Sequence, residues 1–464
     1  MEALNRFFRL KENGTDVRTE VIAGITTFMT MAYIIFVQPF VLSAAGMEPG
    51  AVMVATCLSA ALTTILMALW ARYPIALAPG MGENFFFAFT VVLVMGMTFQ
   101  QALAAVFIAG AVFTVISFTK MRHALVEALP DSIKYAMGAG IGIFIAFIGL
   151  KDMGLLVRNN NPDAIIQMGP LNALPVILGV IGLALTAALM VRRVKGAILI
   201  GIIFTYILFI LFNLVSFTTA EGQALVSAPP SIAPVFFKFD FSQFFTLKFL
   251  LVTIIFIYMD VFDTTGTLIA VAGRAGFLKE GKLERATQAF AVDAIGTSLG
   301  ACLGTSSVQS YIESAAGVES GGRTGLTGIV VAILFLLAMF FNPIVKTIGG
   351  GVQIDQVPAI TMLGAEQNKF NINPILGPAL VVVGAMMASG LKRVEWDDYT
   401  ISIPAFLIVV GIPLTYSITD GLGMGFIALA ILKLVKPDAG KPRPWVIYIL
   451  GFLFILNFVL RHVS

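Results

Sequence analysis

Long apolar runs separated by short polar stretches recur along the chain from Val21 to Leu460. Most of these runs are close to the roughly 20 residues with which an α-helix crosses about 30 Å of hydrocarbon. The sequence lacks the alternating segments of about ten residues that are typical of a transmembrane β-barrel. The pattern therefore predicts an all-α membrane protein whose helices cross the bilayer many times.

The lengths and positions of the apolar runs predict about 14 transmembrane helices. The predicted spans, in chain order, cover residues 20–42, 51–70, 85–97, 102–118, 132–150, 173–191, 196–215, 249–272, 286–303, 314–318 with its approach, 325–342, 374–391, 399–415 and 421–435. A further run over residues 445–460 is surplus to this count. Two alternatives stay open for it: another crossing, or a helix along the membrane interface.

The composition excludes a soluble globular protein. Of the 464 residues, 58% are hydrophobic and 12% are charged, and the mean hydropathy is +0.94. A soluble domain carries about 25% charged residues. The formal net charge of +3 is too small to indicate a nucleic-acid partner. Cys57 and Cys302 both lie in apolar runs, so the sequence supports neither a disulfide framework nor a cysteine metal site. We expect no bound metal and no cofactor besides H⁺ as the coupling ion.

The positions of Lys and Arg predict how the chain is oriented in the membrane. Residues 1–20 are polar and basic without a cleavage site, which predicts a cytoplasmic amino-terminal segment and not a cleaved signal peptide. The later basic clusters all follow even-numbered spans, at Arg72, at Lys120, Arg122 and Lys134, at Arg192, Arg193 and Lys195, at Arg274, Lys279, Lys282 and Arg285, at Lys392 and Arg393, and at Lys433, Lys436, Lys441 and Arg443. The positive-inside rule then places every cluster on the cytoplasmic side of a cell inner membrane.

The two halves of the chain resemble each other at an offset of 231 residues. The segment APGMGENFFF at 78–87 aligns with QSYIESAAGV at 309–318, and Ala-Thr at 55–56 aligns with Ala-Thr at 286–287. Since each half holds an odd number of predicted spans, the second half must be inverted in the membrane. A 7+7 inverted repeat is typical of secondary transporters. The alternative is chance similarity between two hydrophobic stretches.

Helix-breaking residues interrupt the third and tenth spans at corresponding positions. The interruptions are residues 78–82 (APGMG) and 304–307 (GTSS), followed by Glu83-Asn84 and by Glu313-Ser314. Broken backbone at membrane depth is tolerated only where protein or a cavity satisfies its polar groups. We expect half-helices from Phe85 and from Ser314 that point their partly positive amino ends at the membrane midplane. Two such ends would enclose a polar pocket.

Four carboxyl residues, Asp260, Asp263, Asp293 and Glu313, lie within or beside predicted spans. Such groups are costly in the bilayer and usually face a functional cavity. The alternative for each is a structural hydrogen bond, or a helix boundary that lies one turn away from the predicted one. Asp260 and Asp263 are one helical turn apart, and two close carboxyl groups tend to share one proton. That property suits a proton-coupled carrier. Glu83 either joins this set or lies at the surface.

Aromatic and amide side chains beside the two interruptions indicate the kind of ligand. Tyr311 and the Phe85, Phe86 and Phe87 run can offer ring faces, and Asn84 can offer an amide. Together with carboxyl groups they match a planar heterocycle that carries N–H donors. Other polar solutes fit the same residue types.

Four stretches resemble the azaguanine-permease-like purine carriers of the nucleobase–cation symporter-2 family. They are NGTDVRTEVIAGITTFMTMAYIIFVQP at 13–39, APGMGENFFF at 78–87, DVFDTTGTLIAVA at 260–272 and YIESAAGVESGGRTGLT at 311–327. The resemblance implies a core domain (21–118 and 249–342), a gate domain (132–215 and 374–435) and an extra hydrophobic segment (443–464). It also implies H⁺-coupled uptake of hypoxanthine, guanine or adenine by a homodimer.

The resemblance also implies roles for single residues. Asn84, Asp260 and Glu313 match substrate-binding positions, and Asp263 matches a position needed for transport. Asp293 matches an acid in the ninth span, and Tyr311 lies where related uracil carriers place a ring near the base. The predicted substrate-binding residues are therefore Asn84, Phe86, Asp260, Tyr311, Glu313 and Ser314, and the predicted proton-coupling residues are Asp260, Asp263, Asp293 and Glu313.

One departure from the family pattern bears on proton coupling. Uracil carriers of the wider family use a His in the eighth span, whereas His123 and His462 lie outside that motif here. Coupling is therefore expected to rest on carboxyl groups.

Two other functions deserve comparison with purine transport. An anion carrier of the sulfate or bicarbonate type would share the architecture, but its site would favour basic residues over acids. An intramembrane aspartyl protease would also need membrane aspartates, but its Gly-x-Gly-Asp signature is absent, because Gly80-Met-Gly82 is followed by Glu83 and Gly421-Leu-Gly423 by Met424. The sequence thus predicts a secondary transporter and not an enzyme.

Overall fold

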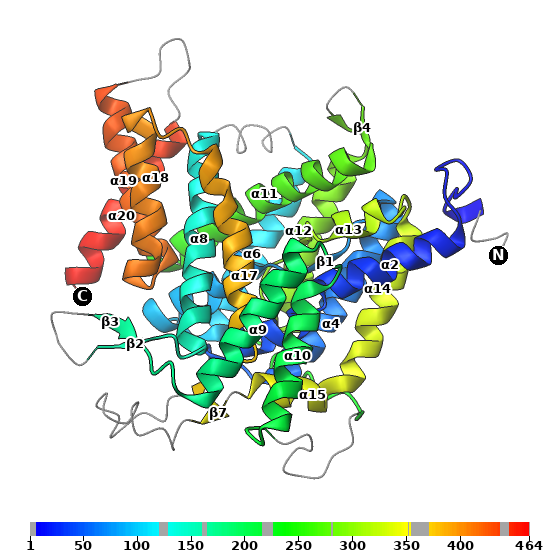
Figure 1. Cartoon of the computed structure of the whole chain (residues 1–464). Helices are drawn as coiled ribbons and strands as arrows, with labels where there is room; N and C mark the ends of the chain where they lie inside the picture. Colours follow the sequence, from blue (N-terminus) through cyan, green and yellow to red (C-terminus); the bar gives the residue numbers. More distant parts are fainter. Residues whose placement is uncertain are drawn as a thin grey trace.

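The computed structural model describes residues 6–119, 129–159, 165–215, 226–279, 282–350, 352–353, 371–436 and 445–463. These residues form a bundle of helices that lie at different tilts (Figure 1). Lys120, Arg122, His123, Lys441 and Arg443 lie outside the described residues.

The first half of the chain is mainly helical. Its elements are α2 (Val17–Met31), α3 (Ile34–Ser43), α4 (Pro49–Leu66), the π-helix η1 (Met67–Ala71), β1 (Leu77–Pro79), α5 (Met81–Phe85), the π-helix η2 (Phe86–Val94), α6 (Phe99–Ser117), α8 (Asp131–Asp152), β2 (Leu156–Arg158), β3 (Ile166–Met168), α9 (Leu174–Val191) and α10 (Ala197–Leu211).

The second half repeats this helical character. Its elements are α11 (Leu247–Ala275), β4 (Leu278–Lys279), β5 (Lys282–Leu283), α12 (Ala286–Leu303), β6 (Val308–Ser310), α13 (Ser314–Glu319), α14 (Gly325–Ala338), the 3₁₀-helix η3 (Met339–Phe341), α15 (Asn342–Gly349), β7 (Val352–Gln353), β8 (Asn371–Ile372), α17 (Gly377–Ala388), the 3₁₀-helix η4 (Ser389–Arg393), α18 (Tyr399–Thr415), α19 (Ile418–Val435) and α20 (Trp445–Val463).

The prediction of a helical membrane protein is confirmed. Among the described residues, seven helices are long and apolar enough to cross a bilayer, and several shorter apolar helices accompany them. Two predicted spans, 286–303 and 399–415, coincide with α12 and α18. The chain is therefore a multi-pass membrane protein. The surplus run at 445–460 forms α20, which packs against α19.

The structure differs from the sequence prediction in local detail. The first predicted span, 20–42, is divided by a turn at Ala32 and Tyr33 into α2 and α3. The first half-helix begins at Met81 and not at Phe85. The described residues also contain four two-stranded antiparallel sheets that an all-α prediction omits. One of these sheets, formed by β1 and β6, lies inside the helical bundle (Figure 1).

Small residues allow pairs of helices to approach closely, as is common where lipid provides no hydrophobic drive for association. A Cβ atom at Gly149 of α8 would lie 2.8 Å from the carbonyl oxygen of Gly377 at the start of α17. A Cβ atom at Gly110 of α6 would lie 2.6 Å from the backbone nitrogen of Ser298 in α12. Each of these contacts joins the first half of the chain to the second.

Glu20 anchors α2 to the amino end of α14. Its fully buried carboxylate accepts hydrogen bonds from the backbone N–H groups of Arg323, Thr324 and Thr327, at 2.8, 3.3 and 3.1 Å. The Thr327 hydroxyl also donates to it, at 2.6 Å. A carboxylate at a helix amino terminus satisfies N–H groups that lack helical partners and interacts favourably with the helix dipole.

Glu20→Ala is therefore expected to lower the free energy of unfolding by about 2–4 kcal/mol, because it leaves several buried donors without an acceptor. The thermal unfolding midpoint of the detergent-solubilised protein measures this loss. Glu12→Ala is the matched control, since the Glu12 side chain is 70% exposed and makes only a surface ion pair with Arg9. An unchanged midpoint in Glu20→Ala would contradict the anchoring role.

Candidate substrate and proton site

The interruptions of the two broken spans meet as a short antiparallel sheet. Leu77, Ala78 and Pro79 of β1 lie opposite Ser310, Gln309 and Val308 of β6. The pairing continues on both sides, because Gly80 N–H donates to Ser307 O at 2.9 Å and Tyr311 N–H donates to Ala76 O at 2.9 Å. These bonds satisfy backbone groups that neither helix can satisfy. The sheet thus fixes where α5 and α13 begin.

Gly80 lies directly against polar side chains of both broken spans. A Cβ atom there would stand 2.5 Å from Gln309 Nε2 and closer still to Glu83 Oε2, so a larger residue at this position would have to displace the flexible ends of both side chains. The glycine therefore leaves room for polar side chains of both broken spans.

Asn84 of α5 and Asp260 of α11 are fully buried and are held by neighbouring serines. The Ser306 hydroxyl donates to Asn84 Oδ1, and the Ser307 hydroxyl donates to Asp260 Oδ1. Gln38 of α3 supports this arrangement, because its Nε2 atom donates to Ser306 Oγ at 3.2 Å. The structure therefore brings two of the predicted substrate-binding residues to one point beside β6.

Several polar atoms near this point are buried without a hydrogen-bond partner among the described residues, including Gln38 Oε1 and both carboxyl oxygens of Glu83. Three more are the donor Asn84 Nδ2 and the acceptors Asp260 Oδ2 and Gln309 Oε1. A buried polar group without a partner costs about 1–3 kcal/mol, so such groups are rare unless a ligand or water completes them. A small molecule that combines N–H donors with an acceptor would satisfy all three.

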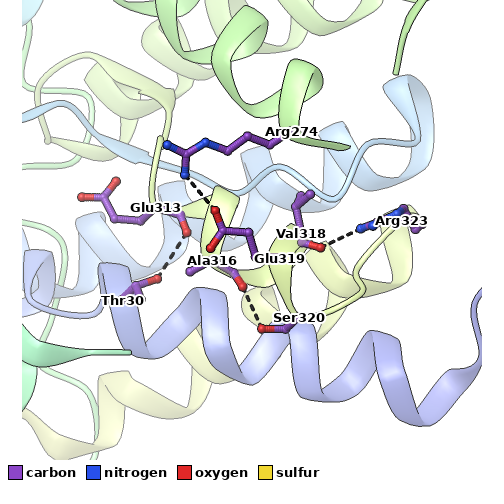
Figure 2. A network of polar contacts seen from close by, with 8 residues as sticks. All are labelled: Thr30, Arg274, Glu313, Ala316, Val318, Glu319, Ser320 and Arg323. Atoms are coloured by element: carbon purple, nitrogen blue, oxygen red, sulfur yellow. Dashed lines mark hydrogen bonds and ion pairs between the residues drawn. The ribbon is translucent and has the colours of Figure 1, made fainter. Parts of the chain in front are cut away.

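Glu313 immediately precedes α13. It is held by a residue of α2 and by a residue of the turn between α2 and α3. The Tyr33 hydroxyl donates to Glu313 Oε1 at 2.8 Å, and the Thr30 hydroxyl donates to the Glu313 backbone oxygen at 3.4 Å. Figure 2 shows that the Glu313 side chain points away from the ion pair of Arg274 with Glu319. Glu313 thus presents its carboxyl group to the interior of the bundle and not to the exposed end of α13.

Three other predicted residues make protein contacts that stabilise the crossing. Asp293 accepts hydrogen bonds from Ser310 N–H at 2.7 Å, from the Ser310 hydroxyl at 2.6 Å and from the Thr264 hydroxyl. The Tyr311 hydroxyl donates to Pro79 O at 2.5 Å. The Ser314 hydroxyl accepts from Ala76 N–H at 3.0 Å. Tyr311 and Ser314 therefore tie the two broken spans together, and Asp293 ties α12 to β6 and to α11.

The aromatic residues of η2 are buried beside the same crossing. Phe86 contacts Phe256 of α11 edge to face, with 4.8 Å between ring centroids, and both rings are fully buried. Phe85 stacks on Phe89 at 5.4 Å. The predicted ring of Phe86 thus lies next to the helix that carries Asp260.

The structure brings to this point several residues to which the sequence assigns no role. They are Tyr33, Gln38, Ser306, Ser307 and Gln309. Three of them, Ser306, Ser307 and Gln309, lie in the largely polar stretch 305–310 directly after Gly304, and this stretch is the signal that the sequence offers. Glu83 is fully buried, which excludes the surface alternative.

The buried acids have no cationic partner in the described part of the chain. The ion pairs found there are Arg9–Glu12, Lys134–Asp131 and Arg274–Glu319, and each includes at least one well exposed side chain. In the same residues, no three His, Cys, Asp or Glu side chains are placed to hold a metal ion. The site is therefore rich in carboxyl groups and poor in fixed positive charge.

Comparisons with known proteins agree with this architecture. A family model described as "Permease family" (Xan_ur_permease) matches residues 18–365. The chain is 40% identical over 467 residues to the guanine/hypoxanthine permease PbuG of Bacillus subtilis, covering 98% of this chain and 99% of that protein. It is also 40% identical over 457 residues to the adenine permease AdeP of Escherichia coli, covering 98% and 96%.

A solved structure shares the fold at much lower sequence identity. The transmembrane domain of the cyanobacterial bicarbonate transporter BicA matches with a TM-score of 0.56 and 15% identity, covering 89% of this chain and 97% of that domain. The family match extends over most of the sequence, and the resemblance inferred from the four motifs is confirmed. The chain belongs to this permease family and is a transporter, not an enzyme.

Proposed function

We propose that the protein takes up purine nucleobases, hypoxanthine and guanine or adenine, together with H⁺. The observation that carries this proposal is that Asn84 and Asp260, held by the consecutive residues Ser306 and Ser307, are buried with an amide donor and a carboxyl oxygen left without partners. A purine ring edge offers an N–H donor next to an acceptor, so it complements this pair. The relatives named as guanine/hypoxanthine and adenine permeases support the same substrate class.

The proposed architecture has about 14 spans in a 7+7 inverted repeat. A core domain would comprise residues 21–118 and 249–342, and a gate domain residues 132–215 and 374–435. The pairing of β1 with β6 supports the repeat, because each strand precedes a half-helix in its own half of the chain. We place residues 1–20 in the cytoplasm and the protein in the cell inner membrane as a homodimer. Residues 443–464 would form an extra helix outside the repeat.

The proposed cycle uses carboxyl groups to couple two cargoes. Protonation of an acid among Asp260, Asp263, Asp293 and Glu313 would favour purine binding at the crossing of the broken spans. Movement of the core against the gate would then expose the site to the cytoplasm, where base and proton leave. Since the purine is neutral, one H⁺ carries one positive charge inward with it. H⁺ is the coupling ion, and the cycle needs no cofactor.

Uptake of radiolabelled guanine, hypoxanthine or adenine into reconstituted vesicles tests this proposal. An inward-negative potential of 100 mV provides about 2.3 kcal/mol per charge, which supports an accumulation of roughly 50-fold for one H⁺. Accumulation should collapse when a protonophore removes the gradient. Equal uptake with and without the gradient would exclude symport, and no uptake of any purine would exclude the substrate class.

A further inference from the structure

Glu83 is a fully buried acid in the first turn of α5. Neither of its carboxyl oxygens receives a hydrogen bond from an amide, a hydroxyl or a cation of the described residues. The titratable groups that interact with it are Asp263 and Asp260 on α11 and the Tyr311 phenol after β6. Helix α8 also packs against α5. Beside Gly82, the residue before Glu83, α8 places the apolar side chain of Ile141. Glu83 thus lies among other acids, a phenol, apolar atoms and the Gln309 side-chain amide, which does not donate to it.

The carboxyl group of Glu83 faces that of Asp263 in particular. Two ionised carboxylates repel strongly when one, Glu83, is fully buried and the other, Asp263, is half-buried, and in the described chain neither has a Lys, Arg or His partner. A single proton between the two groups replaces this repulsion with a short-range hydrogen bond. The local geometry therefore favours a pair that holds one proton.

Hydrogen bonding also indicates which member carries that proton. Gln309 Nε2 donates to Asp263 Oδ2 at 3.5 Å, and a donated hydrogen bond stabilises the ionised form of a carboxyl group. Glu83 lacks such a donor. The proton therefore lies on Glu83, whose O–H donates to Asp263. Asp260 differs from this pair, because its Oδ1 atom is held by Ser307 and its Oδ2 atom is free for a ligand.

We infer that Glu83 is a proton-coupling residue, which carries the transported H⁺ against Asp263 while Asn84 and Asp260 bind the purine. This inference rests on the proposed symport function. On the cytoplasmic side Glu83 releases its proton to water and becomes a carboxylate, and on the opposite side it is protonated again. Glu83 and Asp263 then bind the proton, and Asn84 and Asp260 bind the purine, within one polar cluster.

Glu83→Gln tests this separation in proteoliposomes that contain the full chain. Glutamine keeps a donor toward Asp263 but cannot lose a proton. We expect accumulation of labelled purine driven by a pH gradient to fall at least tenfold. Exchange of labelled for unlabelled purine at equal pH on both sides should stay within about twofold of the parent protein. Glu12→Gln, on an exposed side chain, is the control and should change neither measurement.

The partner acid provides an independent test. Asp263→Asn should produce the same loss of gradient-driven accumulation with exchange retained, and the double variant should lose no more than either single variant, because the pair holds one proton. Normal gradient-driven accumulation in Glu83→Gln or in Asp263→Asn would overturn the inference. Loss of exchange as well, in folded Glu83→Gln protein, would also overturn it by making Glu83 a substrate-binding or structural residue. A parent protein indifferent to the gradient would instead contradict the proposed symport itself.

Discussion

Asp260→Asn is expected to reduce purine uptake by about 100-fold. The Ser307 hydroxyl can still donate to the asparagine carbonyl, so the local fold is preserved. The free Oδ2 atom, however, becomes an uncharged amide group that donates where the ligand also donates. Removing one charged partner of a buried hydrogen bond costs about 2–5 kcal/mol, and each 1.4 kcal/mol is a factor of ten. Initial uptake rates at low purine concentration measure this loss.

Asp397→Asn is the matched control for Asp260→Asn. Asp397 is exposed in the connection before α18, far from the crossing in sequence, and its substitution should leave uptake unchanged. Both variants need equal amounts of folded protein in the membrane. Near-normal uptake by Asp260→Asn would move the substrate site away from α11.

Glu313→Gln is expected to lower uptake by roughly tenfold to 100-fold. The Tyr33 hydroxyl continues to donate to the glutamine oxygen, so the contact between α2 and the approach to α13 remains. The variant loses the negative charge and the ability to take up a proton at a half-buried position beside the crossing. Substrate competition and the dependence of uptake on external pH distinguish a loss of purine binding from a loss of coupling.

Glu319→Gln provides the comparison on the same segment. Its carboxylate lies at the exposed end of α13, where it forms an ion pair with Arg274 (Figure 2). A surface ion pair of this kind contributes only about 0–1 kcal/mol. Uptake by Glu319→Gln should therefore match the parent protein. A similar loss in both variants would assign the effect to the segment and not to Glu313.

Hydropathy predicts a helix most accurately where the limits of the apolar run coincide with the limits of the helix. The spans predicted at 286–303 and 399–415 coincide with α12 and α18 for this reason. The half-helix of the third span was placed too late, since Glu83 and Asn84 lower the hydropathy of a first turn that begins at Met81. The polar residues Glu83 and Asn84 therefore kept the first turn of α5 out of the predicted span.

The identity of the buried acids could be predicted from sequence, but their partners could not. Apolar surroundings alone marked Asp260 and Glu313. The serine hydroxyl that holds Asp260 and the tyrosine hydroxyl that holds Glu313 lie 47 and 280 residues away along the chain. Hydrogen bonds across such separations depend on the pairing of β1 with β6, and no local pattern encodes that pairing. The same limit left the environment of Glu83 undecided.

An experimental structure of the protein with a bound purine tests the central claim most directly. The base should lie at the crossing of β1 and β6, within hydrogen-bonding distance of Asp260 Oδ2 and Asn84 Nδ2, which are two of the buried atoms that lack partners. Density for the base at another place, with both atoms still unpartnered or bonded only to protein, would contradict the site.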